Sequence, residues 1–212
     1  MTKEKQNVLV AGANGTTGRI VINLLVKSET YQPIAMVRKQ DQKDYFEKNN
    51  VSTVLADLEG DLSYAVKNAH KVIFAAGSKG KNVLGVDQEG AKRLTDAAKD
   101  EGASKFVMLS AMGADDPSRN KDLQAYLEAK KNADDYLRAS GLDYTIVRPG
   151  HLTNEEGTGK IQLKKRFENP GKISRADVAK TLVDVLEDGV MQNQFFEIIA
   201  GDTSIEKAVR TV

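Results

Sequence analysis

Hydrophobic residues follow two periodicities along this chain. Short runs rich in Val and Ile alternate with longer segments in which apolar positions recur every three or four residues. The short runs predict β-strands, because continuous apolar runs between turn signals are typical of strands buried on both faces. They lie at residues 8–11, 34–37, 51–56, 72–75, 106–109, 144–147 and 195–200. The longer segments predict helices, the strongest at residues 17–27, 87–101, 123–140 and 175–187.

The order of these elements predicts the fold class. Strand and helix alternate over the first three quarters of the chain, and the strands are continuously apolar. Such strands form a mostly parallel, doubly wound α/β sheet with helices on both faces and right-handed crossovers. We therefore expect a single domain over residues 1–212. Within it, residues 151–172 are rich in glycine, threonine and charge and are expected to form a small insertion over the cleft.

A glycine-rich turn joins the first predicted strand to the first predicted helix. Gly12 permits a tight turn, Gly15 lets the backbone approach a diphosphate, and Gly18 lets the helix pack closely on the strand. The free amides and the positive end of the helix then suit the diphosphate of a dinucleotide. The expected cofactor-binding residues of this turn are Gly12, Asn14, Gly15, Thr16, Thr17, Gly18 and Arg19.

The end of the second predicted strand indicates which dinucleotide is bound. An acidic residue there binds the ribose 2′-hydroxyl of NAD, whereas a basic residue accommodates the 2′-phosphate of NADP. The strand ends in Val37, Arg38 and Lys39, and Arg19 lies nearby. Two guanidinium groups are thus available for charge-assisted hydrogen bonds to phosphate. The sequence predicts NADP, with NAD less favoured; simple exposure of both arginines is the other interpretation.

Composition argues against several other kinds of function. The 31 basic and 30 acidic side chains give a net charge of +1 and are scattered, which is not typical of a nucleic-acid-binding protein. The absence of cysteine excludes disulfides and thiolate catalysis, and two isolated histidines argue against a metal site. His70 is expected at the surface, whereas His151 is expected at the cleft mouth, either contacting substrate or simply exposed. Without an apolar leader or a membrane-spanning run, a cytoplasmic protein without membrane contact is expected.

Further motifs complete a pattern that resembles a known family. They are Ala-Asp-Leu at 56–58, Phe-Ala-Ala-Gly at 74–77, and Tyr-x-x-x-Lys at 126–130, followed by Arg-Pro-Gly at 148–150. With the glycine turn, these motifs are similar in order and over the whole length to the atypical short-chain dehydrogenase/reductase superfamily. The chain resembles its small NmrA-like and epimerase/dehydratase-like members, which are NAD(P)-binding Rossmann proteins.

The resemblance implies roles for individual residues. Further cofactor contacts would come from Asp57 and Leu58 at the adenine, Ala75, Ala76 and Gly77 along the middle, Lys130 at the ribose, and Pro149 and Gly150 at the nicotinamide. Tyr126 and Lys130 match the catalytic pair of the superfamily, and Ser110 matches the serine that orients the substrate carbonyl. The chain departs from the full pattern in that Ala111 follows Ser110 where relatives often have a second hydroxyl, and no equivalent of the active-site asparagine is evident.

The chemistry of the Tyr126–Lys130 pair also follows from its spacing. Residues four apart on a helix share one face, and a nearby ammonium favours the phenolate form of tyrosine. Tyr126 is therefore a candidate general acid or base for hydride transfer. The alternative is that Tyr126 only packs and hydrogen-bonds, as buried tyrosines commonly do.

Three functions remain open at this point. The leading prediction is an NADP-dependent oxidoreductase that acts on a small carbonyl or hydroxyl compound. The alternatives are an epimerase- or dehydratase-like enzyme that retains its NAD(P), and a non-catalytic NAD(P)-binding redox sensor. Neither the identity of the small-molecule substrate nor the oligomeric state follows from the sequence.

Overall fold

The main sheet follows the doubly wound order. The computed structural model describes residues 4–78 and 80–211, and within them this sheet has nine strands. Seven are parallel neighbours in the following order: β3 (Ser52–Leu55), β2 (Tyr31–Val37), β1 (Gln6–Ala11), β4 (Lys71–Phe74), β5 (Lys105–Leu109), β6 (Tyr144–Pro149) and β10 (Gln194–Ala200). The strand order reverses between β1 and β4, which is the position at which open α/β sheets form their ligand crevice.

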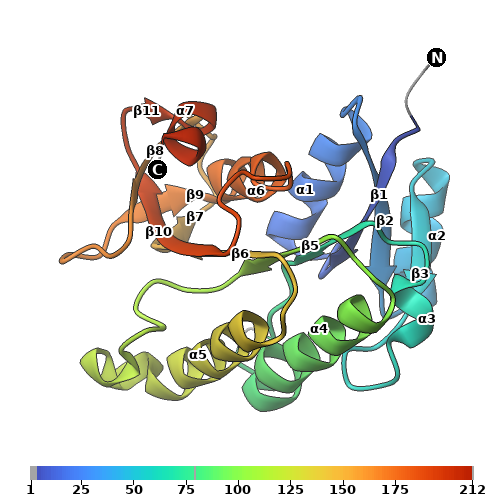
Figure 1. Ribbon diagram of the computed structural model, residues 1–212, viewed down its shortest axis with the longest axis horizontal. Helices are drawn as coiled ribbons and strands as arrows, with labels where there is room; N and C mark the ends of the chain where they lie inside the picture. Colours follow the sequence, from blue (N-terminus) through green and yellow to red (C-terminus); the bar gives the residue numbers. More distant parts are fainter. Residues whose placement is uncertain (1–3, 79, 212) are drawn as a thin grey trace.

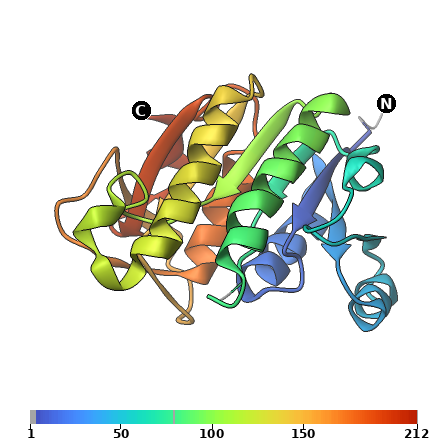
Figure 2. The ribbon, with the colours of Figure 1, turned by 90° about the horizontal axis from the view of Figure 1, so that it is seen from below.

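Helices cover both faces of the sheet, as Figure 1 shows. One face carries α1 (Thr16–Val26) and α6 (Arg175–Asp184), and α2 (Gln40–Lys48) and α7 (Ile205–Arg210) add to the same apolar cluster. The other face carries α3 (Ser63–Val66), α4 (Ala91–Asp100) and α5 (Gln124–Ala139). Figure 2 shows α4 and α5 side by side across that face. Short turns η2 (Pro117–Arg119) and η3 (Lys121–Leu123) lead into α5.

Alternation along β1 explains the two-sided core. Val8 and Val10 belong to the cluster on the α1 face, whereas Leu9 and Ala11 belong to the cluster on the α4 face. All four side chains are fully buried, because a central parallel strand has helices on both sides. The predicted fold class is therefore confirmed, and the reason is the one inferred from the continuous apolar runs.

Residues 151–172 contribute strands to two sheets. β7 (His151–Thr153) pairs in parallel with β9 (Lys172–Ser174) in a separate two-stranded sheet. β8 (Lys160–Lys164) pairs antiparallel with β10, and β11 (Thr203–Ser204) pairs antiparallel with β8. Part of this segment thus extends the edge of the main sheet. Its lysine-rich, alternating strand β8 has an exposed face and therefore lacks the continuous apolar run on which the strand predictions were based.

The helix predicted at residues 87–101 begins in an unexpected form. Residues Val83–Gly90 form a π-helix, η1, and regular α-helix follows only from Ala91. The Asn82 side chain caps η1 by accepting a hydrogen bond from the Gly85 N–H at 3.1 Å. Single π-turns are uncommon and are frequently found at functional sites, and this one borders the cleft described below.

Two buried lysines close the amino end of the sheet. Lys71 of β4 and Lys105 of β5 are register neighbours, and each is 1% exposed. Lys71 donates to the Leu186 carbonyl at 2.7 Å and pairs with Asp188. Lys105 donates to the carbonyls of residues 187 and 190 at 2.9 and 2.7 Å. The lysines thereby bind carbonyl groups in the turns that follow α6 and connect these turns to the sheet.

Candidate functional site

A cavity of about 590 Å³ opens at the carboxyl end of the sheet, at the switch point between β1 and β4. Its walls come from the segments that follow β1 to β5 and from α5 and β7. The predicted site residues that line it are Gly12, Asn14, Gly15, Thr16, Thr17, Arg38, Asp57, Leu58, Ala75, Ala76, Gly77, Ser110, Tyr126 and Lys130. The fold therefore gathers residues from six separate segments around one hollow.

The glycine turn is packed too closely for side chains at two positions. Gly12 has a φ of +83°, and a Cβ there would lie 2.6 Å from the backbone of Ala76. A Cβ on Gly18 would lie 2.1 Å from the Gly12 carbonyl oxygen. Gly18 does not line the cavity; it lets α1 begin directly against the turn, the helix-packing role expected from the sequence.

The amino end of α1 is suited to an anion. Gly15 is the N-cap residue, no side chain caps the helix, and its first turn contains no acidic residue. Gly15 and Thr16 are exposed beside the cavity. The first amides of a helix have no intrahelical partner and carry the positive end of the helix dipole. The turn thus offers backbone donors where a diphosphate would bind, so the residues present fit a dinucleotide.

The two arginines proposed for the 2′-phosphate occupy different positions. Arg38 lines the cavity at the end of β2. Arg19 does not line it; its guanidinium donates to the Asn14 carbonyl at 3.3 Å and to the Asn14 Oδ1, and it lies 4.3 Å from the centre of the Tyr45 ring. Arg19 therefore stabilises the glycine turn, whereas Arg38 belongs to the cavity wall.

Other predicted positions lie outside the cavity wall. Pro149 ends β6, and Gly150 packs under Gly171, whose carbonyl oxygen would lie 2.3 Å from an added Cβ. His151 is exposed at the start of β7, and the Leu152 that follows it lines the cavity. The cofactor roles given to Pro149 and Gly150 and the substrate contact of His151 stay predictions.

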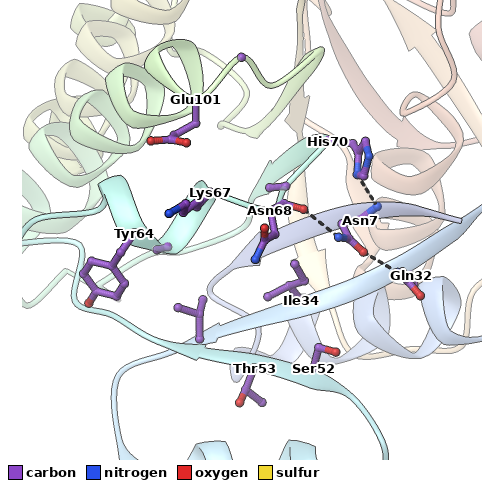
Figure 3. A pocket seen from close by; sticks show the side chains of 14 residues that line it. Asn7, Gln32, Ile34, Ser52, Thr53, Tyr64, Lys67, Asn68, His70 and Glu101 are labelled. Atoms are coloured by element: carbon purple, nitrogen blue, oxygen red, sulfur yellow. Dashed lines mark hydrogen bonds between the residues drawn. The ribbon is translucent and has the colours of Figure 1, made fainter.

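A second hollow, of about 720 Å³, lies at the opposite, amino end of the sheet (Figure 3). Part of its polar lining is bonded internally: Asn7 donates to the Asn68 carbonyl and accepts from Gln32, and the Asn7 N–H donates to Nδ1 of His70. His70 thus has a structural bond near the surface. The glycine turn and the Tyr126–Lys130 pair are both at the other end, where the candidate site lies.

The Tyr126–Lys130 pair forms one wall of the carboxyl-end cavity. The Lys130 Nζ lies 5.7 Å from the centre of the Tyr126 ring. It is paired with Asp87 Oδ1 at 3.3 Å and donates to the Leu109 carbonyl at 3.5 Å. The ammonium is therefore held beside the phenol ring, as the spacing along the helix predicted.

Asp87 is a site residue that sequence reasoning missed. It lies in the π-helical segment η1, is 1% exposed, and accepts a hydrogen bond from the Ser78 N–H at 3.0 Å besides pairing with Lys130. The sequence placed residue 87 only at the start of a helix. No signal in the sequence indicated this role, because the burial of Asp87 and its pairing with Lys130, more than forty residues away, arise only in the folded chain.

Ser110 is hydrogen-bonded away from the cavity. Its hydroxyl donates to Asp134 Oδ2 at 2.8 Å, and the same oxygen accepts a hydrogen bond from Arg148 Nε at 2.9 Å and is ion-paired with Arg148 Nη2 at 2.9 Å. Asp134 is fully buried, and burial raises its pKa, although the Arg148 guanidinium opposes that shift. The carbonyl-orienting role that the resemblance implied for Ser110 therefore competes with an existing hydrogen bond.

Comparison with known proteins bears on this cavity. A family model described as NAD(P)H-binding matches residues 12–189, which run from the glycine turn to the turns after α6. The chain belongs to the NAD(P)H-binding family. The resemblance to NAD(P)-binding Rossmann proteins inferred from the motifs is thereby confirmed.

Relatives of this NAD(P)H-binding protein are named either as epimerases or as oxidoreductases. The uncharacterised sugar epimerase YhfK of Bacillus subtilis is 40% identical over 96% of this chain and 98% of its own length. A Bacillus halodurans structure provisionally named NAD-dependent epimerase/dehydratase is 37% identical, covers 98% and 100% of the two chains, and has a TM-score of 0.92. The oxidoreductase ylbE of Lactococcus lactis is 28% identical over 98% and 96%, with a TM-score of 0.87.

Among residues 4–78 and 80–211, no three His, Asp or Glu side chains group closely enough to hold a metal ion. No helix in the same described part of the chain is long and apolar enough to span a bilayer.

Proposed function

We propose that this protein is an NADP-dependent oxidoreductase that transfers hydride to or from a small carbonyl or hydroxyl compound. One observation carries the proposal: the glycine turn and the Tyr126–Lys130 pair line the same cavity. A bound cofactor and a proton-transferring phenol would thus share one enclosed space. A binding protein without catalysis needs the first of these features but not the second.

Each part of the cavity has a separate task in this proposal. The amides at the start of α1 bind the diphosphate, and the small residues 75–77 leave room for the cofactor beside the backbone. The nicotinamide, when bound, supplies or accepts hydride. Tyr126 gives the proton to the substrate oxygen or removes it. Lys130, held by Asp87 and the Leu109 carbonyl, stabilises the phenolate that remains.

Cofactor preference rests on Arg38. Arg38 lines the cavity, its guanidinium makes no ion pair with any other residue in the described ranges 4–78 and 80–211, and the end of β2 carries no acid. Arg38→Ala should weaken NADPH binding by roughly ten- to a hundredfold and leave NADH binding little changed. Isothermal titration of both cofactors checks this, with Lys39→Ala as the control for loss of a neighbouring charge outside the cavity. Equal weakening of NADPH and NADH would refute the assignment.

Catalysis is tested by following nicotinamide absorbance with a panel of aldehydes, ketones and quinones. We expect turnover with several of them, and we expect Tyr126→Phe to abolish turnover while NADPH still binds. Tyr136→Phe is the matched control, because Tyr136 lies on the same helix but bonds to Asp96 outside the cavity. Tight NADPH binding without turnover of any compound would contradict the enzyme and favour the redox sensor.

The names of the two most similar relatives reported above favour a second candidate. An epimerase that retains NAD(P) oxidises its substrate transiently and then reduces the product, so it needs the same acid or base. In that case a polyhydroxylated substrate would be interconverted with its epimer without net consumption of added NADPH. Chromatography of sugar substrates incubated with the protein distinguishes the two activities, since the oxidoreductase consumes one cofactor for each product formed.

A further inference from the structure

The hydrogen bond of Ser110 fixes what its oxygen offers to the cavity. A serine hydroxyl has one proton and two acceptor lone pairs. In this structure the proton lies in the 2.8 Å bond to Asp134 Oδ2. The Ser110 oxygen therefore presents lone pairs, and not its proton, to any group that enters the cavity.

Asp134 cannot reverse the direction of this bond. Its Oδ2 also accepts a hydrogen bond from Nε of Arg148 at 2.9 Å and is ion-paired with Nη2 of the same side chain at 2.9 Å, so both of its lone pairs are occupied. Burial raises the pKa of Asp134, but an added proton would occupy Oδ1, which has no hydrogen-bond partner within residues 4–78 and 80–211. The Asp134 Oδ2 therefore accepts the hydrogen bond from Ser110 whether Asp134 is ionised or protonated. Turning the hydroxyl toward a substrate would forfeit a hydrogen bond to a buried charged group, which is among the stronger kinds.

Ser110 and Tyr126 both line the cavity, and contacts of Lys130 relate their positions. Lys130 connects them, because its Nζ lies 5.7 Å from the Tyr126 ring and bonds to the carbonyl of Leu109, the residue before Ser110. Tyr126 and Lys130 are hydrogen-bond donors toward a substrate, and Ser110 is an acceptor. A substrate whose carbonyl binds Tyr126 therefore gains a bond to Ser110 only if it carries its own donor beside that carbonyl.

We propose that Ser110 is a specificity residue that accepts a hydrogen bond from the substrate, so the site favours carbonyl compounds bearing a hydroxyl or N–H beside the reacting carbon. This inference rests on the proposed oxidoreductase activity. It differs from the role that the resemblance implied, in which Ser110 donates to the carbonyl itself. The two roles predict different responses to the loss of the hydroxyl.

A matched pair of ketones separates the two roles. In 2-hydroxyacetophenone the group beside the carbonyl donates a hydrogen bond, whereas in 2-methoxyacetophenone the same oxygen has no proton. The wild-type protein should show a higher kcat/KM for the hydroxyketone. Ser110→Ala should lower the ratio of the two kcat/KM values by about tenfold, the loss expected for one hydrogen bond. Ser110→Thr, which keeps a hydroxyl, should restore the ratio.

Two other outcomes would overturn the inference. If Ser110 donates to the carbonyl, Ser110→Ala lowers kcat/KM equally for both ketones and the ratio does not change. If wild type shows no preference for the hydroxyketone, the substrate class is wrong. Thermal unfolding of each variant establishes that the fold is retained.

Binding measurements keep this test separate from that of the proposed function. If neither these ketones nor any compound of the wider panel is reduced, the oxidoreductase proposal fails, but titration of the two ketones into NADP-saturated protein still tests whether Ser110 acts as an acceptor. The acceptor role of Ser110 is supported if wild type binds the hydroxyketone more tightly than the methoxyketone and this preference is lost in Ser110→Ala and regained in Ser110→Thr. The role is refuted if wild type and Ser110→Ala bind the hydroxyketone with equal affinity.

Discussion

Replacing Asp87 with asparagine leaves the Lys130 ammonium buried without its counter-charge. The two side chains are 2% and 4% exposed, and their charged atoms are 3.3 Å apart. Asparagine has one acceptor, which the Ser78 N–H requires, so its NH₂ group would face the ammonium. Breaking a buried ion pair costs about 3–5 kcal/mol. We expect the lower end, about 3 kcal/mol, because the Leu109 carbonyl still binds Lys130.

Chemical and thermal unfolding at pH 7 measure this cost. For a domain of this size, about 3 kcal/mol corresponds to a fall in Tm of roughly 6–12 °C. Asp100→Asn is the control, because it removes an exposed carboxylate from the end of the neighbouring helix α4. In a Lys130→Met background, Asp87→Asn should cost much less, since the uncompensated charge is gone. A loss below about 1 kcal/mol, or an equal loss in both backgrounds, would refute the reasoning.

Two further perturbations test the ends of the sheet. Burial and the Lys71 ammonium lower the pKa of Lys105 from 10.5 to about 8, so the unfolded chain binds more protons between these values and stability rises with pH. From pH 7 to 9 the free energy of unfolding should rise by about 1.4 kcal/mol in the wild-type protein. Urea unfolding should show that Lys105→Met lacks this rise. An identical pH dependence in both proteins would contradict the lowered pKa of Lys105. Gly12→Ala should destabilise the protein more than Gly102→Ala and weaken NADPH binding, because both glycines have positive φ but only Gly12 meets backbone within 4 Å. Equal effects in thermal unfolding and titration would show that conformational strain alone matters.

Features carried by neighbouring residues were predictable from the sequence. The glycine turn is contiguous with its strand and helix, so Gly12, Gly15 and Gly18 sufficed to predict both the turn and its ligand class. The parallel sheet followed from continuous apolar runs for the same reason. Strand β8 was not predicted, because it is an edge strand with lysines on one side and so lacks a continuous apolar run. Its partner β10 also lies more than thirty residues away in sequence.

The hydrogen-bond directions within the site were not predictable. Ser110 was identified by its position after the fifth strand, but Asp134 and Arg148, which occupy its proton, come from α5 and β6. Asp87 meets Lys130 across more than forty residues, and the π-helix that places it there leaves no periodic mark in the sequence. Such contacts depend on how helices dock on the sheet, which spacing along the chain does not encode.

Helix α5 connects these two buried charge pairs. Lys130 and Asp134 lie one helical turn apart, and each is neutralised by a different segment, Asp87 before α4 and Arg148 on β6. The two helix residues also attract each other, since the Lys130 ammonium acts to lower the pKa of Asp134 against the larger effect of burial. Moving α5 relative to the sheet would therefore separate buried charges on both sides at once. The docking of α5 on the sheet therefore has two consequences for the site. It holds Lys130 beside Tyr126, and it places Asp134 where it accepts the Ser110 proton, so that Ser110 cannot donate to a substrate.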